Sequence, residues 1–169
     1  HFPEGQKTCF PSPLEFIDSS NSFGTIEKWF WDFGDGTTYE ASTEDEKNPP
    51  VHNFPAPGNY AVRLAILAND GCVSDTFTQI IVAGSKPRAD FGYMPFFLCN
   101  GYPVTFIDSS KVEFGTIDQW SWKINQQEYD MQRPQPMILS SNRNRIELSV
   151  ATKEGCVSNV FVDSVVIGT

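Results

Sequence analysis

The strongest constraint on the fold of this chain is an internal duplication. The pentapeptide FIDSS occurs at residues 16–20 and again at residues 106–110, which is 90 positions later in a chain of 169 residues. A Trp-x-Trp motif follows each copy at nearly the same distance. Self-similarity at a fixed period is the sequence signature of repeated structural units. We therefore expect two copies of one domain, at residues 1–84 and 85–169.

The four cysteines obey the same duplication. Cys9 and Cys99 each precede the repeated pentapeptide by seven residues, and Cys72 and Cys156 each lie in a GCVS tetrapeptide. Of the three pairings that four cysteines allow, only Cys9–Cys72 with Cys99–Cys156 makes each repeat self-contained, and we predict that pairing. Each bridge would close a loop of about 60 residues and contribute roughly 4 kcal/mol to stability. Such bridges imply an oxidising compartment, whereas the alternative is four buried free thiols in a cytosolic protein.

Apolar and polar residues alternate in two matching pairs of segments, at residues 59–68 and 75–82 and again at residues 145–151 and 158–167. A period of two is typical of half-buried strands, and Asn-Asp-Gly and Lys-Glu-Gly turns separate the members of each pair. The Trp-x-Trp motifs place their rings on one face of a further strand. Several short strands with regular turns in each repeat predict an all-β chain of two tandem β-sandwich domains, each with two antiparallel sheets.

Charge and hydropathy narrow the classes of partner. The chain carries 12 Lys and Arg against 21 Asp and Glu, a formal net charge of -9, which disfavours nucleic acid and anionic lipid as partners. No stretch approaches the roughly 20 apolar residues of a membrane span. No signal peptide is recognisable, and because the chain begins with His1 we expect a mature or excised segment whose targeting and anchoring parts lie elsewhere.

Three segments of the first repeat together carry a family resemblance. They are WDFGDG at residues 31–36, NPPVHNF at 48–54 and PGNYAVRL at 57–64. This pattern closely resembles the signature of the PKD (polycystic kidney disease) domain family. The resemblance implies an immunoglobulin-like sandwich that serves as an extracellular spacer, as an adhesion module or as an accessory module of a secreted hydrolase. The added cysteines resemble the variety found in surface and secreted proteins of Bacteroidota, including cargo of their type IX secretion system.

The second repeat departs from this signature. The segment WKINQQ at residues 122–127 replaces the acidic, glycine-rich turn, and SNRNR at residues 141–145 replaces the Pro-Gly-x-Tyr segment. We expect a divergent PKD-like sandwich there, since the duplication and the cysteines still relate the two repeats. Any function tied to the Asp-Gly turn is not expected in the second repeat.

Acidic residues give the candidate metal site. Asp32 and Asp35, with their neighbouring glycines, could contribute to a Ca²⁺ site, which requires six to eight oxygen ligands. The structural alternative is a hairpin turn in which Gly adopts positive φ and Asp bonds the local backbone, and we favour it because the spacing is not that of an EF-hand. We interpret the acidic residues 44–46 as a solvated loop, and Asp18 and Asp108 as turn formers. No cofactor is expected.

A run of aromatic residues gives the candidate binding site. Tyr93, Phe96, Phe97 and Tyr102 lie around a proline before and after Cys99, and the first repeat has no such run. Because these apolar residues cannot all point into one sheet face, some should be exposed or cover a neighbour. The alternatives are packing between domains and a site for a partner protein or a sugar ring.

Catalysis has little support in the sequence. The only histidines are His1 and His52, and with the cysteines paired no nucleophile and base can be assembled. We therefore expect a non-catalytic, extracellular spacer or adhesion module of a larger surface or secreted protein. Its partners would be other domains of the same chain, surface proteins or glycans. The alternatives are a carbohydrate-binding or substrate-presenting accessory module of a secreted hydrolase and a structural component of a secretion or gliding-motility assembly.

Overall fold

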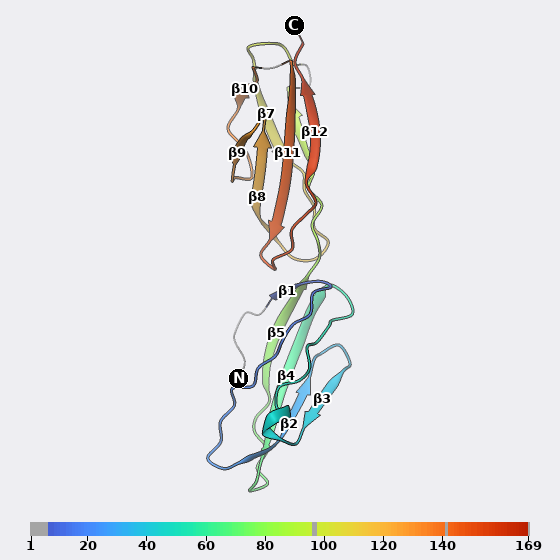
Figure 1. Cartoon of the computed structure of the whole chain (residues 1–169), viewed down its shortest axis with the longest axis vertical. Coiled ribbons are helices and arrows are strands. Elements are labelled where there is room, and N and C mark those ends of the chain that lie inside the picture. Colours follow the sequence, from blue (N-terminus) through green and yellow to red (C-terminus); the bar gives the residue numbers. More distant parts are fainter. Residues whose placement is uncertain (1–6, 96–97, 141, 169) are drawn as a thin grey trace. The chain divides into compact units, whose positions relative to one another are not determined.

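The computed structural model of the protein describes residues 7–95, 98–140 and 142–168 (Figure 1). The chain divides into two compact units, His1–Gly84 and Ser85–Thr169. Within the described residues, regular structure consists of twelve β-strands and one 3-10 turn, η1 (Glu44–Glu46), so the predicted all-β class is confirmed. No helix in this part of the chain is long and apolar enough to cross a membrane.

The described residues of the first unit form one five-stranded sheet. Its strands are β1 (Lys7–Cys9), β2 (Ile26–Asp32), β3 (Thr38–Ala41), β4 (Gly58–Ala68) and β5 (Phe77–Gly84). Their order in the sheet is β1-β5-β4-β2-β3, and all neighbours are antiparallel except β1, which runs parallel to β5. The predicted hairpin of the two long strands is β4–β5, and it forms the centre of the sheet together with β2 (Figure 1).

The core of the first unit lies on one face of this sheet. Trp29 and Trp31 alternate with exposed or half-buried residues along β2 and are almost fully buried. They lie opposite Ile66 and Leu64 on β4, so the aromatic and aliphatic side chains pack side by side. Phe16 covers them from the other side, with its ring centroid 6.0 Å from that of Trp31. The Trp-x-Trp motif is therefore a core motif, as predicted.

The second layer of the first unit differs from the expected second sheet. It consists of the segments around Leu14 and His52, which are joined by one isolated antiparallel bridge. Two prolines precede Leu14 closely, and four prolines lie within residues 49–57. Because proline has no N–H group to donate to a strand ladder, these segments can cover the core without forming regular strands.

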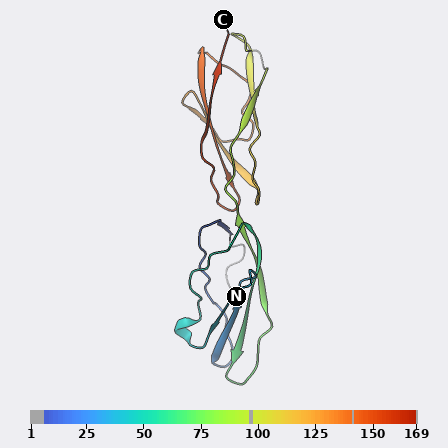
Figure 2. The same ribbon diagram turned by 90° about the vertical axis from the view of Figure 1, so that its right-hand side faces the viewer.

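The second unit is a sandwich of two sheets. Its strands are β6 (Phe91–Met94), β7 (Pro103–Asp108), β8 (Ile117–Ile124), β9 (Gln127–Tyr129), β10 (Met137–Ile138), β11 (Arg143–Thr152) and β12 (Phe161–Val166). One sheet has the order β10-β7-β6 and the other β12-β11-β8-β9. Figure 2 shows the two layers of this unit facing each other. Phe91 and Phe106 from the first sheet pack against Trp122 from the second, with ring centroids 5.2 and 5.9 Å away.

Each repeated aspartate anchors a tryptophan. In the first unit, the buried Asp18 accepts a hydrogen bond from Trp29 Nε1 at 2.8 Å and another from the Ser20 N–H at 2.8 Å. In the second unit, Asp108 accepts the bond from Trp120 Nε1 at 2.8 Å and one from the Ser110 N–H at 2.9 Å. The repeated FIDSS and Trp-x-Trp motifs are thus parts of one structural element, in which a turn-forming carboxylate also satisfies a core indole.

The chain passes through the second unit from one end to the other. Where it enters, the Ser85 N–H donates to the Phe114 carbonyl at 2.9 Å. Where it leaves, the Gly168 N–H donates to the Leu98 carbonyl at 2.8 Å. The ten residues of β11 run between these two ends, a distance of about 30 Å at the rise of a β-strand.

The predicted disulfide pairing is wrong. Cys9 and Cys156 are disulfide-bonded, whereas Cys72 and Cys99 carry free, exposed thiols. Neither the predicted Cys9–Cys72 bridge nor the predicted Cys99–Cys156 bridge is therefore present.

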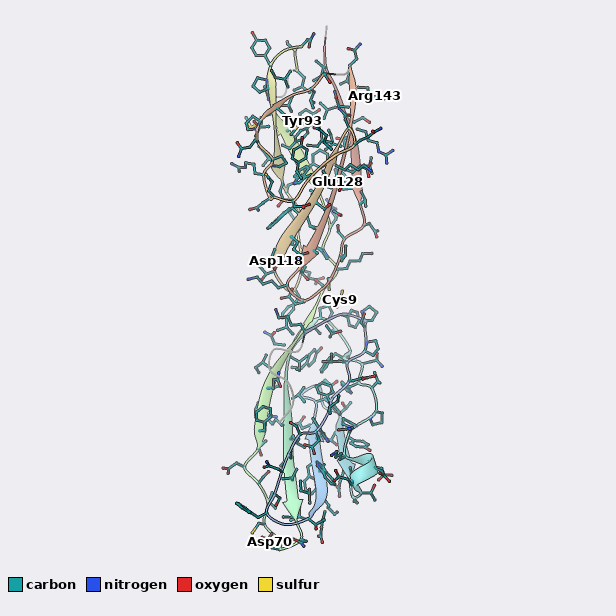
Figure 3. All side chains as sticks on the ribbon, turned by 60° about the vertical axis from the view of Figure 1, so that its left-hand side comes forward. Cys9, Asp70, Tyr93, Asp118, Glu128 and Arg143 are labelled. Carbon is teal, nitrogen blue, oxygen red and sulfur yellow. The ribbon has the colours of Figure 1, made fainter. Side chains whose placement is uncertain are left out.

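The physical reason is that the two cysteines of a unit lie at opposite ends of its sheet. Cys9 on β1 is paired with Gly84 at the end of β5, whereas Cys72 lies in the turn before β5. The seven residue steps of β5 separate these ends by roughly 23 Å, and a disulfide requires Cα atoms within about 7 Å. The backbone of Cys99 likewise forms a β-bridge with Gly168, beyond the end of β12, and Cys156 lies in the turn before that strand. Figure 3 labels Cys9 and Asp70, which lie at opposite ends of the first unit.

Candidate functional site

The Asp-Gly turn between β2 and β3 holds the predicted metal ligands. Asp32 Oδ1 accepts the Gly34 N–H at 2.9 Å, and Asp32 Oδ2 accepts Arg63 Nη1 at 2.9 Å. Asp35 Oδ1 accepts both the N–H and the hydroxyl of Thr37, at 2.9 and 2.6 Å. The carboxylates thus stabilise the turn itself, which is the structural alternative stated for this motif. Among the described residues, no group of three His, Cys, Asp or Glu side chains could hold a metal ion.

His52 completes this turn from the second layer. Its Nε2 lies 2.7 Å from Asp35 Oδ2, and its ring stacks on Phe33 with centroids 3.9 Å apart and an interplanar angle of 4°. Burial tends to raise the pKa of Asp35, but the hydrogen bonds from Thr37 and the adjacent His52 outweigh it and lower the pKa below its usual value. The Thr37 hydroxyl donates to Asp35, not to the imidazole, so the histidine activates no nucleophile in this cluster.

The close packing of this turn explains one of its glycines. Gly34 has a φ of 75°, a region that L side chains rarely adopt. A Cβ atom at this position would lie 2.7 Å from the Ala61 carbonyl oxygen on β4. The turn therefore needs glycine for conformation and for space. Gly36 has a φ of 93° but faces open space, so only its conformation requires glycine.

The predicted aromatic binding set is not assembled by the described residues. Tyr93 lies on β6, half-buried, and packs against the core of the second unit. Tyr102 is 67% exposed in the loop before β7. Phe96 and Phe97 lie outside the described residues. Binding by this run therefore stays a prediction.

A groove in the second unit was not predicted. It has a volume of about 500 Å³ and follows the edge of β8, where Trp120 is half-buried. Its polar lining includes Asp118 and Asp130, with Ser121 and Ser149 from the two central strands. Asp118, labelled in Figure 3, lies near the start of β8. The groove thus combines an aromatic ring with two carboxylates and two hydroxyls.

The groove exists because β9 is short. In the first unit, Trp29 lies opposite Ala41 on the neighbouring strand β3 and is fully buried. In the second unit, β9 pairs with β8 only from Trp122 onward and ends at Tyr129, so no strand of the described residues lies opposite Trp120 on that side. The changed turn at Asn125 and Gln126 did not signal this gap, because it lies at the opposite end of β9 from Trp120.

Comparisons with known proteins bear on the predicted resemblance of the first repeat. The sequence model described as the PKD domain matches residues 6–82, which confirms the predicted resemblance for that repeat. The PKD1 domain of Vibrio anguillarum Epp is 18% identical, with a TM-score of 0.43, and the match covers 51% of this chain and 98% of that domain. The PKD character of the second repeat and its relation to the Bacteroidota variety stay predictions.

Two longer matches span both units. The pre-pro-metalloprotease PrtV of Vibrio cholerae is 28% identical over 148 residues, which cover 85% of this chain and 15% of that protein. The chain therefore spans only a small part of this relative. The fibronectin(III)-like modules of Clostridium thermocellum CbhA share the fold, with a TM-score of 0.51 at 12% identity over 97% of this chain and 90% of theirs. Two tandem immunoglobulin-like sandwiches are thus the fold class of the chain.

Proposed function

We propose that this chain is a non-catalytic spacer or adhesion segment of a larger exported protein. The observation that carries the proposal is the path of the chain through the second unit, which it enters at one end and leaves about 30 Å away at the other. A module with this path lengthens the protein by its own length, so it separates whatever precedes it from whatever follows.

The polar chemistry of the first unit supports a structural role. The His52–Asp35 pair stabilises the turn after β2, and both oxygens of Asp32 accept hydrogen bonds within the unit. The similarity to a pre-pro-metalloprotease, of which the matched region is 15%, agrees with an accessory segment in a much longer secreted protein. A surface or extracellular location follows from the same proposal.

An exchange experiment tests the spacer role. We would replace the 169 residues in the full-length protein by the fibronectin(III)-like modules of CbhA, which share the fold at 12% identity. A spacer depends on length and stability and not on its surface, so display of the flanking parts and their activity should be retained. Loss of activity toward a small soluble substrate after the exchange would refute a non-catalytic role. Loss of cell or surface attachment alone would assign the segment to adhesion.

The groove at Trp120 favours carbohydrate binding as a second candidate. Sugar rings pack on aromatic side chains, and carboxylates and hydroxyls can bind their hydroxyl groups, so the lining of the groove fits a short glycan. Asp118→Asn and Asp130→Asn should weaken binding at least tenfold, whereas Asp163→Asn, an exposed carboxylate on β12 outside the groove, should not change it. Titration calorimetry with glycans selected on an array provides the measurement. Unchanged affinity in both groove variants would exclude the groove as the site.

A further inference from the structure

The two free thiols occupy positions at which the other repeat is disulfide-bonded. Cys72 corresponds to Cys156 in the duplicated GCVS tetrapeptide, and Cys99 corresponds to Cys9 before the repeated pentapeptide. Cys9 and Cys156 are bonded, whereas Cys72 and Cys99 are free. Each type of cysteine, early or late in its repeat, therefore occurs once bonded and once unbonded in this chain.

The turn at Cys72 has the conformation of the turn at Cys156. The Ala68 N–H donates to the Cys72 carbonyl at 2.9 Å, and the Thr152 N–H donates to the Cys156 carbonyl at 2.9 Å. Three further backbone bonds match at 2.9 Å: Gly71 to Ala68 with Gly155 to Thr152, Asn69 to Thr25 with Lys153 to Thr116, and Ser74 to Ile66 with Ser158 to Val150. The backbone that carries a disulfide at Cys156 is thus already formed at Cys72.

The loop at Cys99 matches the loop at Cys9 in the same way. The residue after each cysteine donates its N–H to a glycine at the end of the unit, Phe10 to Gly84 at 2.9 Å and Asn100 to Gly168 at 3.2 Å. Both cysteines accept a bond from the N–H three residues later, at 2.7 Å for Cys9 and 3.4 Å for Cys99. An early cysteine therefore lies beside the last strand, at the end where the chain leaves its unit.

The surface around Cys72 is less covered than its counterpart. In the second unit, both the N–H and the carbonyl of Phe114 bond to Ser85, from the segment by which the chain enters that unit. Phe23, the counterpart of Phe114, is fully exposed, and none of the described residues makes the corresponding bonds to it. An open hollow of about 330 Å³ lies beside it, lined by Cys72 and by apolar side chains including Val73. Among the described residues, this end of the first unit thus lacks the cover that Ser85 gives to the equivalent end of the second unit.

We propose that Cys72 and Cys99 form disulfides with cysteines of other repeats of the same kind, Cys72 with an early cysteine and Cys99 with a late cysteine. The length of each sheet prevents either thiol from reaching the second cysteine of its own unit. In a series of tandem repeats, the end where the chain leaves one repeat is followed by the end where it enters the next. The proposed bond therefore joins an early cysteine of one repeat to a late cysteine of the following one.

The bond requires an oxidant, which we take to be a disulfide-bearing molecule in the compartment to which the protein is exported. The first cysteine thiolate attacks a sulfur of that disulfide and releases one thiolate, so a mixed disulfide forms. The thiolate of the second repeat then attacks the cysteine sulfur and releases the other thiolate. Two electrons pass to the oxidant, two protons leave the thiols, and one disulfide links the repeats.

The test uses the 169-residue chain itself, since one copy offers both types of cysteine. Cys72→Ser, which retains only the thiol of Cys99, is mixed in equal amounts with Cys99→Ser, which retains only that of Cys72. The mixture is oxidised in a glutathione redox buffer at millimolar protein concentration. We expect dimers that contain one of each variant to exceed same-variant dimers roughly tenfold, equivalent to about 1.4 kcal/mol. Random pairing would give equal amounts of the two classes.

Mass spectrometry of peptides from the non-reduced dimers identifies the linked cysteines. In the unsubstituted chain, Cys72–Cys99 links between copies should produce a ladder of dimers, trimers and longer species, which reduction abolishes. Three results would overturn the proposal: random pairing, no dimer, or a Cys72–Cys99 link within one copy. The double variant with both serines should remain monomeric and should unfold as the unsubstituted chain does, since both side chains are exposed. The outcome is independent of whether the segment is a spacer or binds a glycan.

Discussion

Replacing Asp18 by alanine should destabilise the first unit far more than the equivalent Asp108→Ala destabilises the second. Asp18 is buried and accepts two hydrogen bonds, one of them from the indole of the fully buried Trp29. Hydrogen bonds to charged groups contribute roughly 1.5–3 kcal/mol each, so the loss of both should cost about 3 kcal/mol. Asp108 makes the equivalent bonds, but Trp120 is only half-buried and lines an open groove. Water can replace the missing acceptor there, and we expect a loss of about 1 kcal/mol.

Hydrogen exchange in increasing urea, followed by mass spectrometry, measures the free energy of unfolding of each unit separately. Peptides from β4 report on the first unit and peptides from β11 on the second. For a domain of this size, a loss of about 3 kcal/mol corresponds to roughly 12–24 °C in the melting temperature of the first unit. Asp18→Asn keeps one acceptor oxygen and should lose about half as much. Equal losses in the two units, or a loss below about 1 kcal/mol for Asp18→Ala, would show that the indole bond does not anchor the core.

Three further predictions concern the turns of the first unit. Because the pKa of Asp35 is lowered in the folded state, its carboxylate stabilises the unit above the unfolded pKa of about 3.9 and loses this effect as pH falls through the lower folded value. Asp35→Asn should therefore reduce the pH dependence of the free energy of unfolding in urea between those two pKa values. An unchanged pH dependence would contradict this. Gly34→Ala should lower the free energy of unfolding by about 3 kcal/mol and Gly36→Ala by about 1 kcal/mol, because only at Gly34 would the added Cβ also clash with the backbone of β4. Equal losses in the two variants would show that this clash contributes nothing. The hydrogen bond and negative charge of Asp70 raise the pKa of the Cys72 thiol, so Asp70→Asn should speed its alkylation by iodoacetamide at pH 8, and an unchanged rate would refute this electrostatic effect.

Much of the fold could be predicted because it depends on local sequence patterns. The period-two alternation along residues 59–68 and its copy predicted β4 and β11. The Trp-x-Trp motifs correctly predicted core positions for Trp29, Trp31 and Trp122, whereas Trp120 is half-buried beside the groove. The repeated Asp18 and Trp29 could also have been paired from the sequence, since both recur together. A buried indole needs an acceptor, and a duplicated carboxylate nearby is the simplest source.

The rest depended on distances that the sequence does not contain. The matching motifs around the cysteines show that those of the two repeats are equivalent, but they do not show that Cys9 and Cys72 lie at opposite ends of β5. The groove at Trp120 depends on where β9 ends, and strand ends are poorly determined by alternation alone. The spacing of Asp32 and Asp35 favours a turn over a calcium site, but only the partners of each carboxylate oxygen show that both side chains bond within the unit.

The path of the chain through the second unit has a mechanical consequence. Tension applied at Ser85 and Gly168 would act along the strands, because these residues lie at opposite ends of the unit. The last strand, β12, is paired with β11 over six residues, and a load parallel to both strands stretches these hydrogen bonds together instead of one after another. Forced unfolding depends on the rate of unfolding, and shear of a whole ladder raises the barrier that sets this rate. The force needed to unfold the second unit should therefore be well above that expected from its modest size.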